Sequence, residues 1–430
     1  MQNKISTNPL LQQKRIDRDN KLLINPDNVF WALLSGKKAD ADKKVHSLYT
    51  KFQKKLDTSM KDFRFKTDLN SVYINPTDLC NADCPYCYVP ASIRKRGRQM
   101  DEAQLTGVLK KIDSYFRRKQ NKTATKPIII YHASEPLLVK DMLFSSMVKF
   151  SKKFHFGIQT NAILLEKKDV EFLKSHKVSV GISLDSFDSQ INDRTRKTPQ
   201  GSNYNKAIQA IDWFNGYEGL NVITTVTKYN VKNLSAIVSF LHSKGVSCLL
   251  LNPVRASRSC VVNLRPAQET LTTHFIKAVE EAIELSKKSK RRIIIGNFSN
   301  IVLGITAPLA RRLMCDITPC GGGGRCFFAV TASGDMIPCG EFTGLPEFCG
   351  GNIFHSSIEK AISSQAFKKV RARIVEKIAE CDVCVYRNIC GAPCPAEVYS
   401  LSRNLNTISP YCEFYKKIIK YAFKLIAEDK

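Results

Sequence analysis

The strongest constraint on the fold is an alternation of short β-rich runs with helix-like stretches, which extends from residue 71 to about residue 265. The six runs, in chain order, are SVYIN, PIIIYH, FHFGIQT, VSVGISLD, LNVITTVT and VSCLLLNPV. Strands that alternate with helices predict a parallel sheet covered by helices, either an open doubly wound sheet or a partial barrel. In both architectures reactive groups gather at the carboxyl ends of the strands. We therefore expect an α/β fold with its site at that edge.

The regions that flank residues 71–265 differ from them in composition and in the spacing of apolar residues. Residues 1–70 are lysine-rich with helical spacing, so we expect a small helical N-terminal unit with a packing or a substrate-recognition role. The apolar residues that could line one face there are Val29, Leu33, Leu34, Leu48 and Phe52. Residues 266–314 predict a helical bridge. Residues 315–430 are rich in glycine and cysteine, which is typical of a metal-nucleated domain, and they end in a predicted helix.

Fifteen cysteines in a chain of 430 residues point to metal rather than to disulfides. The N-terminus lacks the apolar stretch of an export signal, and no run approaches the roughly 18 apolar residues that span a bilayer. We therefore expect a cytoplasmic protein, in which thiols stay free and clustered thiolates bind metal. The formal net charge of +27 favours acidic partners, such as nucleic acid, an anionic membrane surface or an acidic peptide.

Three cysteines lie on one loop directly after the first predicted strand. They are Cys80, Cys84 and Cys87, with C-x3-C-x2-C spacing. Three thiolates satisfy three irons of a cubane cluster and leave the fourth iron open. A closed site needs a fourth ligand nearby, and the next cysteine is Cys248. The spacing therefore favours a catalytic cluster, and the alternative is a zinc or closed-cluster knuckle that takes a distant fourth ligand.

This loop resembles the hallmark of the radical S-adenosylmethionine (SAM) superfamily, which places an aromatic residue, here Tyr86, just before the last cysteine. The resemblance implies that Cys80, Cys84 and Cys87 hold a catalytic [4Fe-4S] cluster whose open iron binds SAM. It also implies reductive cleavage of SAM to methionine and a 5′-deoxyadenosyl radical. The implied fold is a partial (β/α)6 TIM-like barrel, which agrees with the six strands counted above.

Other strand ends resemble further elements of the family. YHASEP resembles a Gly-Gly-Glu-Pro element, so Glu135 is implied to accept a hydrogen bond from the SAM ammonium, although Ala133 and Ser134 replace the glycines. NDRTR resembles an H-D-x-x-R element and makes Arg196 the candidate partner of the SAM carboxylate. Further implied contacts of SAM or substrate are Tyr86, Gln159, Asn161, Ser183 and Asp185. The alternative for each is a polar residue that caps a helix.

Eight cysteines near the C-terminus suffice for two fully ligated cubane clusters, which suit electron transfer or structural roles. Their pattern resembles the SPASM extension of radical SAM maturases, with Gly334 and Cys339 forming its G-x4-C element. One implied ligand set is Cys320, Cys326, Cys339 and Cys394, and the other is Cys381, Cys384, Cys390 and Cys412. Zinc ribbons are the alternative. Ordinary buried or free thiols are expected at the cysteines outside the pattern, which are Cys248, Cys260, Cys315 and Cys349.

The resemblance implies three [4Fe-4S] clusters, SAM, and hydrogen abstraction from a ribosomally made peptide or protein. The outcomes in SPASM relatives include thioether and other crosslinks, and oxidation to formylglycine. The sulfatase-maturing branch places an aspartate base directly after the cysteine equivalent to Cys339, where this chain has Gly340. Glu341 follows one place later, and in a strand it would face the opposite side. We therefore expect a crosslinking or related maturase, with formylglycine formation as the alternative.

The expected partners are a peptide or protein substrate and an external one-electron donor such as flavodoxin or ferredoxin. The basic cluster Arg94, Lys95, Arg96 and Arg98 could attract an acidic leader peptide. A winged-helix recognition domain, common in such maturases, is not expected because residues 1–70 show no three-stranded wing. The alternative of another class is a zinc-stabilised nucleic-acid-binding protein, but the basic residues are dispersed without interleaved aromatic residues. We expect neither a membrane nor nucleic acid as a partner.

Overall fold

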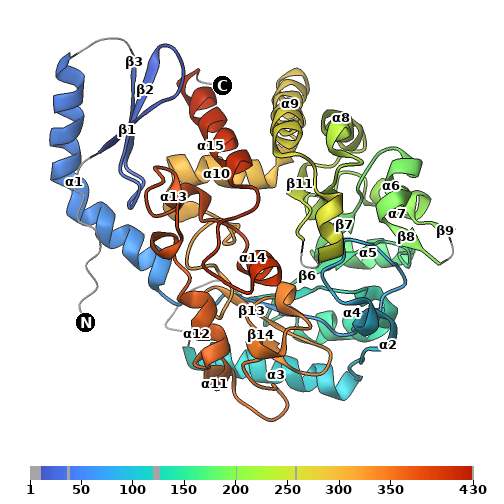
Figure 1. Cartoon of the computed structure of the whole chain (residues 1–430). Coiled ribbons are helices and arrows are strands. Elements are labelled where there is room, and N and C mark those ends of the chain that lie inside the picture. Colours follow the sequence, from blue (N-terminus) through green and yellow to red (C-terminus); the bar gives the residue numbers. More distant parts are fainter. Residues whose placement is uncertain (1–10, 36–38, 120–125, 200, 257–258, 429–430) are drawn as a thin grey trace.

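A nine-stranded sheet forms the centre of the computed structural model, which describes residues 11–35, 39–119, 126–199, 201–256 and 259–428 (Figure 1). The strand order is β12-β11-β10-β7-β6-β5-β4-β13-β14, and all neighbours are parallel except β13 and β14. The six predicted strands are confirmed as β4 (Ser71–Ile74), β5 (Ile128–Tyr131), β6 (His155–Thr160), β7 (Ser179–Ser183), β10 (Leu220–Val226) and β11 (Cys248–Pro253).

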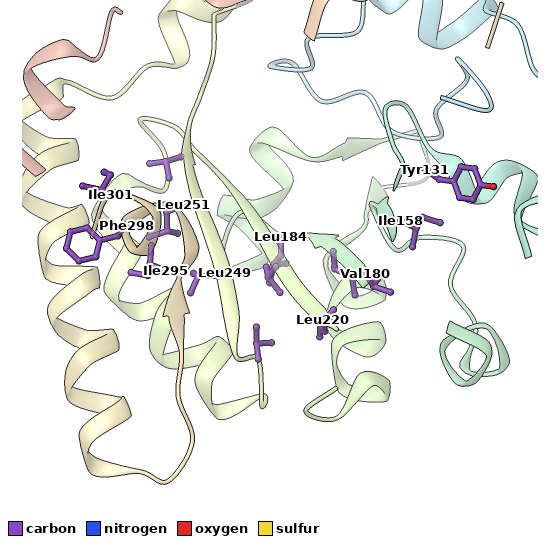
Figure 2. Close-up of a cluster of buried hydrophobic side chains, with 14 of the residues drawn as sticks. Tyr131, Ile158, Val180, Leu184, Leu220, Leu249, Leu251, Ile295, Phe298 and Ile301 are labelled. Atoms are coloured by element: carbon purple, nitrogen blue, oxygen red, sulfur yellow. The ribbon is translucent and has the colours of Figure 1, made fainter. Parts of the chain in front are cut away.

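Helices cover one face of this sheet because alternate strand residues are apolar and fully buried. In β10, Leu220, Val222 and Val226 are buried, whereas Asn221 and Ile223 keep accessible surface. Figure 2 shows the buried layer, in which Leu249 and Leu251 of β11 lie beside the helix that carries Phe298. The opposite face therefore lines the inside of the barrel. The helices between and after the strands are α3 (Glu102–Lys119), α4 (Lys140–Phe150), α5 (Lys167–Ser175), α7 (Tyr204–Phe214), α8 (Leu234–Ser243), α9 (Gln268–Lys288) and α10 (Gly296–Thr306).

Short elements fill the connections of the barrel. They are α2 (Ala91–Arg96), η1 (Pro136–Val139), α6 (Ser189–Thr195), β8 (Lys197–Thr198), β9 (Gly201–Ser202), η2 (Val231–Asn233), η3 (Ser259–Leu264), β12 (Ile294–Ile295) and η4 (Pro308–Ala310). Two-residue strands such as β12 are too short to give a pattern in the sequence, and they were not predicted. Within the described residues, no helix has the length and the apolar composition needed to cross a bilayer.

The C-terminal domain contributes a strand to the barrel sheet. β13 (Phe327–Val330) pairs in parallel with β4, from Phe327 opposite Ser71 to Val330 opposite Ile74, and β14 (Met336–Ile337) returns antiparallel. The barrel and the cysteine-rich domain therefore share one sheet. The remaining elements are η5 (Gly340–Phe342), η6 (Pro346–Phe348), α11 (Ile358–Ile362), α12 (Gln365–Arg371), η7 (Val375–Lys377), α13 (Arg387–Cys390), α14 (Pro395–Ser402) and α15 (Cys412–Ala427).

The N-terminal region is not an all-helical unit, and the sequence prediction was wrong there. A three-stranded antiparallel sheet precedes one helix. The elements are β1 (Gln12–Arg15), β2 (Asn20–Ile24), β3 (Trp31–Ser35) and α1 (Ala39–Phe65), and residues 1–10 lie outside the described part. β2 shows no alternation because both of its faces are buried, with Leu22 in the main core and Leu23 against Tyr49 of α1.

The helix face expected for this region was also wrong. Leu48 and Phe52 of α1 are exposed, whereas Val45, Tyr49 and Leu56 pack against the N-terminal sheet. The apolar residues 29–34 that suggested a continuous helix belong to β3 and the turn before it. A strand buried on both faces is apolar at consecutive positions, so its sequence pattern resembles that of a buried helix.

The N-terminal unit packs on the C-terminal half of the chain, beside α15 (Figure 1). Trp31 Nε1 donates to Ile305 O at 2.8 Å, and its ring packs edge-on against Phe423 of α15. Arg64 near the end of α1 is buried and forms a bidentate ion pair with Glu376, at 2.6 and 2.9 Å. Arg64 Nε also donates to Thr318 O in the cysteine-rich domain at 2.7 Å.

We expect Arg64→Ala to lower the free energy of unfolding by about 2–4 kcal/mol, because Glu376 and Thr318 O then lose their buried partner. Lys61→Ala on the exposed side of the same helix is the control and should change it by less than about 0.5 kcal/mol. Chemical denaturation followed by circular dichroism measures both variants. Equal losses from the two substitutions would contradict the docking role of Arg64.

Candidate active site

The cysteine loop that follows β4 is held by a buried arginine. Arg94 of α2 donates to Val89 O at 3.1 Å and to Ala82 O at 2.9 Å, and its guanidinium lies 3.0 Å from the Asp83 carboxylate. Arg94 O accepts a hydrogen bond from Cys80 N at 3.2 Å. Because its side chain is only 3% exposed, Arg94 braces the loop from inside and does not attract a leader peptide, which corrects the sequence interpretation.

The thiols of this loop lie close together in the interior of the protein. Burial is the main cause that raises the pKa of Cys80 to about 12 and the pKa of Cys84 to about 11, and the neighbouring Cys87 thiol raises both further. No three His, Cys, Asp or Glu side chains of the described chain gather around a single metal position. A cubane requires a wider arrangement, with one thiol for each iron. The donor set of the loop, three thiols that act on one another electrostatically, fits a cluster with three protein ligands.

Glu135 is fully buried and joins the carboxyl ends of β5 and β6. Its Oε1 accepts hydrogen bonds from Leu137 N at 3.1 Å and Thr160 Oγ1 at 2.7 Å, and its Oε2 accepts one from Asn161 N at 2.8 Å. Burial raises the pKa of Glu135 to about 7 against the effect of these hydrogen bonds. Its charge also raises the pKa of Cys80, so the carboxylate lies near the cysteine loop.

The two residues before Glu135 adopt a backbone conformation that favours glycine. Ala133 and Ser134 have φ angles of 69° and 48°, in the left-handed region that costs a non-glycine residue roughly 1 kcal/mol. Ser134 Oγ donates to Asp78 O at 2.7 Å, which helps to hold the turn. The chain therefore keeps this left-handed turn without the two glycines of the family pattern.

Asp185 joins Tyr86 and Arg196. Arg196 Nε lies 3.1 Å from Asp185 Oδ1, and the Tyr86 hydroxyl donates to Asp185 Oδ2 at 2.6 Å. Thr195 Oγ1 and Thr225 N also donate to this carboxylate, at 3.0 and 2.9 Å. The Arg196 guanidinium carbon lies 5.7 Å from the centre of the Tyr86 ring. The sequence placed Tyr86 on the cysteine loop, Asp185 at the end of the fourth predicted strand and Arg196 downstream of it. The structure brings the three residues together.

Asn161 and Ser183 lie at the same edge of the sheet. Asn161 Nδ2 donates to Asn81 Oδ1 at 2.7 Å and so links the end of β6 to the cysteine loop. Ser183 is the last residue of β7 and keeps accessible surface, whereas the preceding Ile182 is buried. The carboxyl edge of the sheet thus carries Glu135, Asn161 and Ser183, which the sequence implied as candidate cofactor contacts.

Tyr88 and His132 lie next to the start of η5 in the C-terminal domain, since a Cβ atom at Gly340 would lie 3.5 Å from the Tyr88 hydroxyl and 3.4 Å from the His132 ring. Burial raises the pKa of Tyr88 and lowers the pKa of His132 to about 4, yet both side chains keep accessible surface. The Tyr88 hydroxyl lies 3.4 Å from the His132 ring nitrogens. The charges of Glu341, Cys87 and Cys339 all raise the pKa of Tyr88 further. Tyr88 therefore stands between the cysteine loop and the C-terminal thiols.

The Glu341 carboxylate lies within electrostatic reach of Tyr88 and Cys339, which corrects the expectation that it points away. Residues 340–342 form the 3-10 helix η5 rather than a strand, so the alternation of strand side chains does not apply. The Glu341 carboxylate lies 2.9 Å from Arg255 Nη1. Burial is the main cause that raises the pKa of the Cys339 and Cys394 thiols, and the charge of Glu341 raises both further. At Gly340, a Cβ atom would lie 3.4 Å from the His132 ring.

Sequence reasoning missed Tyr88, His132 and Arg255. A signal was present for each, because Tyr88 follows the last cysteine of the loop, His132 follows the second strand and Arg255 follows the sixth. Polar residues just past strand ends are the ones that converge at the carboxyl edge of a parallel sheet.

One set of C-terminal thiols surrounds a small hollow. Cys381, Cys384, Cys390 and Cys412 line it together with Tyr386. The Tyr386 hydroxyl is buried without a hydrogen-bond partner in the described structure. A buried donor beside four thiols fits a cluster, whose sulfurs would accept the hydrogen bond.

The other set lies around the glycine run at residues 321–324. Cys320 and Cys394 are buried, and Cys339 packs against them. Arg325 donates to Cys320 O at 3.4 Å and to Phe63 O at 3.0 Å. Its Nη2 is buried and lacks a partner in the part of the chain that the structure describes. A buried donor without a partner fits a cluster at this site too, because a cluster sulfur would accept its hydrogen bond.

Cys315 lies near the thiols of Cys320, Cys326, Cys339 and Cys394, although its place in the sequence suggested an ordinary thiol. A hydrogen bond with the Cys320 thiol is the main cause that raises the pKa of Cys315. Cys315 in turn raises the pKa of the other three thiols of the set, which are Cys326, Cys339 and Cys394. Cys349 is exposed, and the side chain of Cys260 lies outside the described part. The cysteine spacing in the sequence did not indicate that Cys315 lies near this set, because a loop closed by the hydrogen bond from Gly321 N to Met314 O brings it back to Cys320.

Buried arginines connect the cysteine-rich loops through backbone carbonyls. Arg311 donates to Asp316 O at 2.9 Å and to Asn388 O at 2.5 Å. Arg373 donates to Ala392 O and Leu405 O, both at 2.6 Å. Burial lowers the pKa of Arg373 and lowers that of Arg311 to about 10. Part of the positive charge of the chain is therefore internal.

Two family models match the chain. The model of the radical SAM superfamily matches residues 74–241, and the SPASM model, an iron-sulfur cluster-binding domain, matches residues 320–385. The chain belongs to the radical SAM superfamily. The two domains of this radical SAM protein imply iron–sulfur clusters, and this assignment replaces the interpretation as a zinc-stabilised nucleic-acid-binding protein.

Curated relatives cover nearly the whole radical SAM protein. An uncharacterized protein of Archaeoglobus fulgidus is 44% identical over 411 residues, which are 95% of this chain and 92% of the relative. A cysteine-type anaerobic sulfatase-maturating enzyme of Clostridium perfringens is 22% identical over 378 residues, which are 82% of this chain and 96% of the enzyme.

Solved structures share the fold of this radical SAM protein. The structure of anSMEcpe with bound AdoMet has a TM-score of 0.71 at 20% identity and covers 83% of this chain and 98% of its own. Streptococcus suis SuiB has a TM-score of 0.61 at 14% identity and covers 94% of this chain and 98% of its own.

We expect Ala133→Gly to raise the free energy of unfolding by about 0.5–1 kcal/mol, because glycine relieves the left-handed strain at this turn. Ala103→Gly, on the exposed side of α3, should lower it by about 1 kcal/mol. Thermal unfolding of both variants tests the pair. Destabilisation by Ala133→Gly as large as that by Ala103→Gly would show that the turn carries no strain.

Proposed function

We propose that this protein is a radical SAM/SPASM maturase that abstracts hydrogen from a ribosomally made peptide or protein and installs a crosslink or a related oxidation. The place of Tyr88 between the two groups of thiols carries the proposal. Tyr88 lies within electrostatic reach of Cys87 on one side and Cys339 on the other, and a Cβ atom at Gly340 would lie 3.5 Å from its hydroxyl. A substrate residue held there would adjoin both the radical site and the first auxiliary site.

Different residues of the barrel would hold the cluster and SAM. Cys80, Cys84 and Cys87 would hold the catalytic [4Fe-4S] cluster, and SAM bound to it supplies a 5′-deoxyadenosyl radical on one-electron reduction. Glu135 would accept a hydrogen bond from the SAM ammonium, and Arg196 would form an ion pair with the SAM carboxylate. Asp185 positions the guanidinium of Arg196 through the ion pair of 3.1 Å, so the arginine is held before the cofactor binds.

The SPASM thiols would hold two further [4Fe-4S] clusters. We assign Cys320, Cys326, Cys339 and Cys394 to the first, and Cys381, Cys384, Cys390 and Cys412 to the second. Fully ligated clusters have no open iron for SAM, so electron transfer and support of the fold are the roles they suit. The N-terminal unit, residues 11–70, would support this domain, since Arg64 binds Glu376 and Thr318 O.

Two similar structures hold a peptide, which supports a peptide substrate for this protein. One structure of anSMEcpe holds a Cp18Cys peptide, and one of SuiB holds the precursor peptide SuiA. Exposed Arg96 and Arg98 next to the cysteine loop suit an acidic leader peptide. A flavodoxin or ferredoxin would supply the electron. We place the protein in the cytoplasm, whose reducing conditions keep its many thiols free for metal.

Formylglycine formation is the second candidate, and Glu341 favours it. In this reaction the side-chain carbon loses a hydrogen atom, the thiol or hydroxyl loses a proton, and one electron passes to an auxiliary cluster. With a cysteine the product is a thioaldehyde, which water hydrolyses to formylglycine with release of sulfide. A base must therefore lie near the substrate side chain. Glu341 lies within electrostatic reach of Tyr88 and is ion-paired with Arg255 at 2.9 Å. A carboxylate at this place can accept the proton.

We expect Cys84→Ala to abolish the formation of 5′-deoxyadenosine from SAM, because the catalytic cluster loses one of its three ligands. Bound iron should fall from about twelve to about eight atoms per chain, since the SPASM thiols remain. Anaerobic reconstitution, iron and sulfide counting, and chromatography of the nucleoside provide the measurement. Cys349→Ala removes an exposed thiol and should change neither quantity. Unchanged nucleoside formation by Cys84→Ala would rule out the proposed function.

We expect Glu341→Gln to slow conversion of a cysteine peptide such as Cp18Cys by about a hundredfold or more, because glutamine cannot accept the proton. Cleavage of SAM without peptide should persist. Mass spectrometry of the peptide measures the effect, and Glu347→Gln, whose carboxylate accepts a hydrogen bond from Tyr399 at 2.9 Å, is the control. A wild-type enzyme that cleaves SAM but leaves this peptide unchanged would exclude formylglycine formation and retain the crosslinking function.

A further inference from the structure

We infer that Glu397 of α14 is a positioning residue for SAM, because it holds the chain on both sides of η3 against Tyr86. The inference rests on the proposed function in one respect, which is that SAM binds beside the catalytic cysteine loop. It deepens that function, because it assigns a role in cofactor binding to a carboxylate of the C-terminal domain, outside the barrel residues that would contact SAM.

One carboxylate oxygen of Glu397 binds the chain before and after the short helix η3. Glu397 Oε1 accepts a hydrogen bond from Ala256 N at 3.1 Å and lies 3.2 Å from Arg265 Nη2. The Glu397 side chain is only 3% exposed, and a low local dielectric strengthens hydrogen bonds and ion pairs. Both ends of this part of the barrel are therefore fastened to the same point of α14.

Tyr411 reinforces this connection. Its hydroxyl donates to Val254 O at 2.6 Å, and the centre of its ring lies 5.8 Å from the Arg265 guanidinium carbon. Arg265 Nε is buried and has no hydrogen-bond partner among the described residues. Glu397 and the Tyr411 ring therefore hold this guanidinium in place.

The residues held in this way pack against Tyr86 of the cysteine loop. Val254, Ala256 and Val261 form a buried apolar cluster, and Tyr86 and Leu264 pack against it. Val254 and Ala256 lie before η3, whereas Val261 lies within it. The cluster is complete only while both parts of the chain stay in place, and a shift of either one would leave space beside the Tyr86 ring.

Tyr86 connects this apolar cluster to the residues that would bind SAM. Its hydroxyl donates to Asp185 Oδ2 at 2.6 Å, and Asp185 Oδ1 lies 3.1 Å from Arg196 Nε. Arg196 would form the ion pair with the SAM carboxylate. Loss of the Glu397 contacts would therefore loosen the support of Arg196. The effect would be moderate, because Arg255 keeps a separate link to Glu341 at 2.9 Å.

Replacement of the ion pair in the full-length protein tests the inference. The variants Glu397→Ala, Glu397→Gln and Arg265→Ala are reconstituted anaerobically, and the oxidised proteins are dialysed to equilibrium against labelled SAM. We expect the Kd for SAM to rise about tenfold for both alanine variants, and about threefold for Glu397→Gln, whose amide oxygen can still accept from Ala256 N. Bound iron should stay near about twelve atoms per chain, since no cluster ligand is changed.

A double variant and a matched control complete the test. Glu397→Ala/Arg265→Ala should bind SAM about as weakly as either alanine variant, because each of them already loses the same link. Glu359→Gln breaks a surface ion pair with Arg118 at 3.0 Å and should leave the Kd unchanged. A loss of about a hundredfold in the double variant would show that the two residues act separately, and it would overturn the inference.

The remaining outcomes separate the inference from the proposed function. If Glu397→Ala and Arg265→Ala keep their iron and bind SAM as tightly as wild type, the inference falls. If all three single variants lose iron, Glu397 supports only the fold, and the inference also falls. In both cases the proposed function stands as long as the wild-type protein binds SAM. A wild-type protein that holds its full iron and does not bind SAM would overturn the proposed function itself.

Discussion

Hydrogen bonds from buried guanidinium groups to backbone carbonyls hold the cysteine-rich half of the molecule together. Loops that deliver thiols to one point cannot pair their carbonyls in a helix or a sheet, and an unpaired buried carbonyl is costly. Arg94 meets this need in the catalytic loop, and Arg311 and Arg373 meet it in the C-terminal domain. One guanidinium has five donors, so a single side chain can serve several turns.

Because these arginines are buried, the net charge of the chain overstates the positive charge of its surface. A net charge of +27 suggests a surface that attracts anions, yet Arg64, Arg94, Arg311, Arg325 and Arg373 are buried. Thiolate-ligated clusters add negative charge to the interior, and a fixed guanidinium can offset it where solvent cannot. Burial opposes the charged form of Arg311, and the negative charge of a thiolate-ligated cluster nearby would offset this effect.

The sequence predicted what local patterns encode and missed what only the folded chain brings together. Six strands with flanking helices carry a clear period, and the cysteine spacings are local in the chain. β2 was missed because Leu22 and Leu23 are buried on opposite faces, so no alternation remained. The direction of Glu341 depends on a 3-10 turn, and the place of Cys315 depends on a loop closed by one backbone hydrogen bond. Neither feature has a signature in the order of residues.

The pairing of β13 with β4 determines how this molecule can move. Four residues of the C-terminal domain continue the ladder of the barrel, from Phe327 beside Ser71 to Val330 beside Ile74. A hinge between the two domains would have to break these parallel hydrogen bonds, so the halves behave as one rigid body. If the proposed clusters bind as assigned, the distance between the catalytic and the auxiliary centres would then stay constant through turnover.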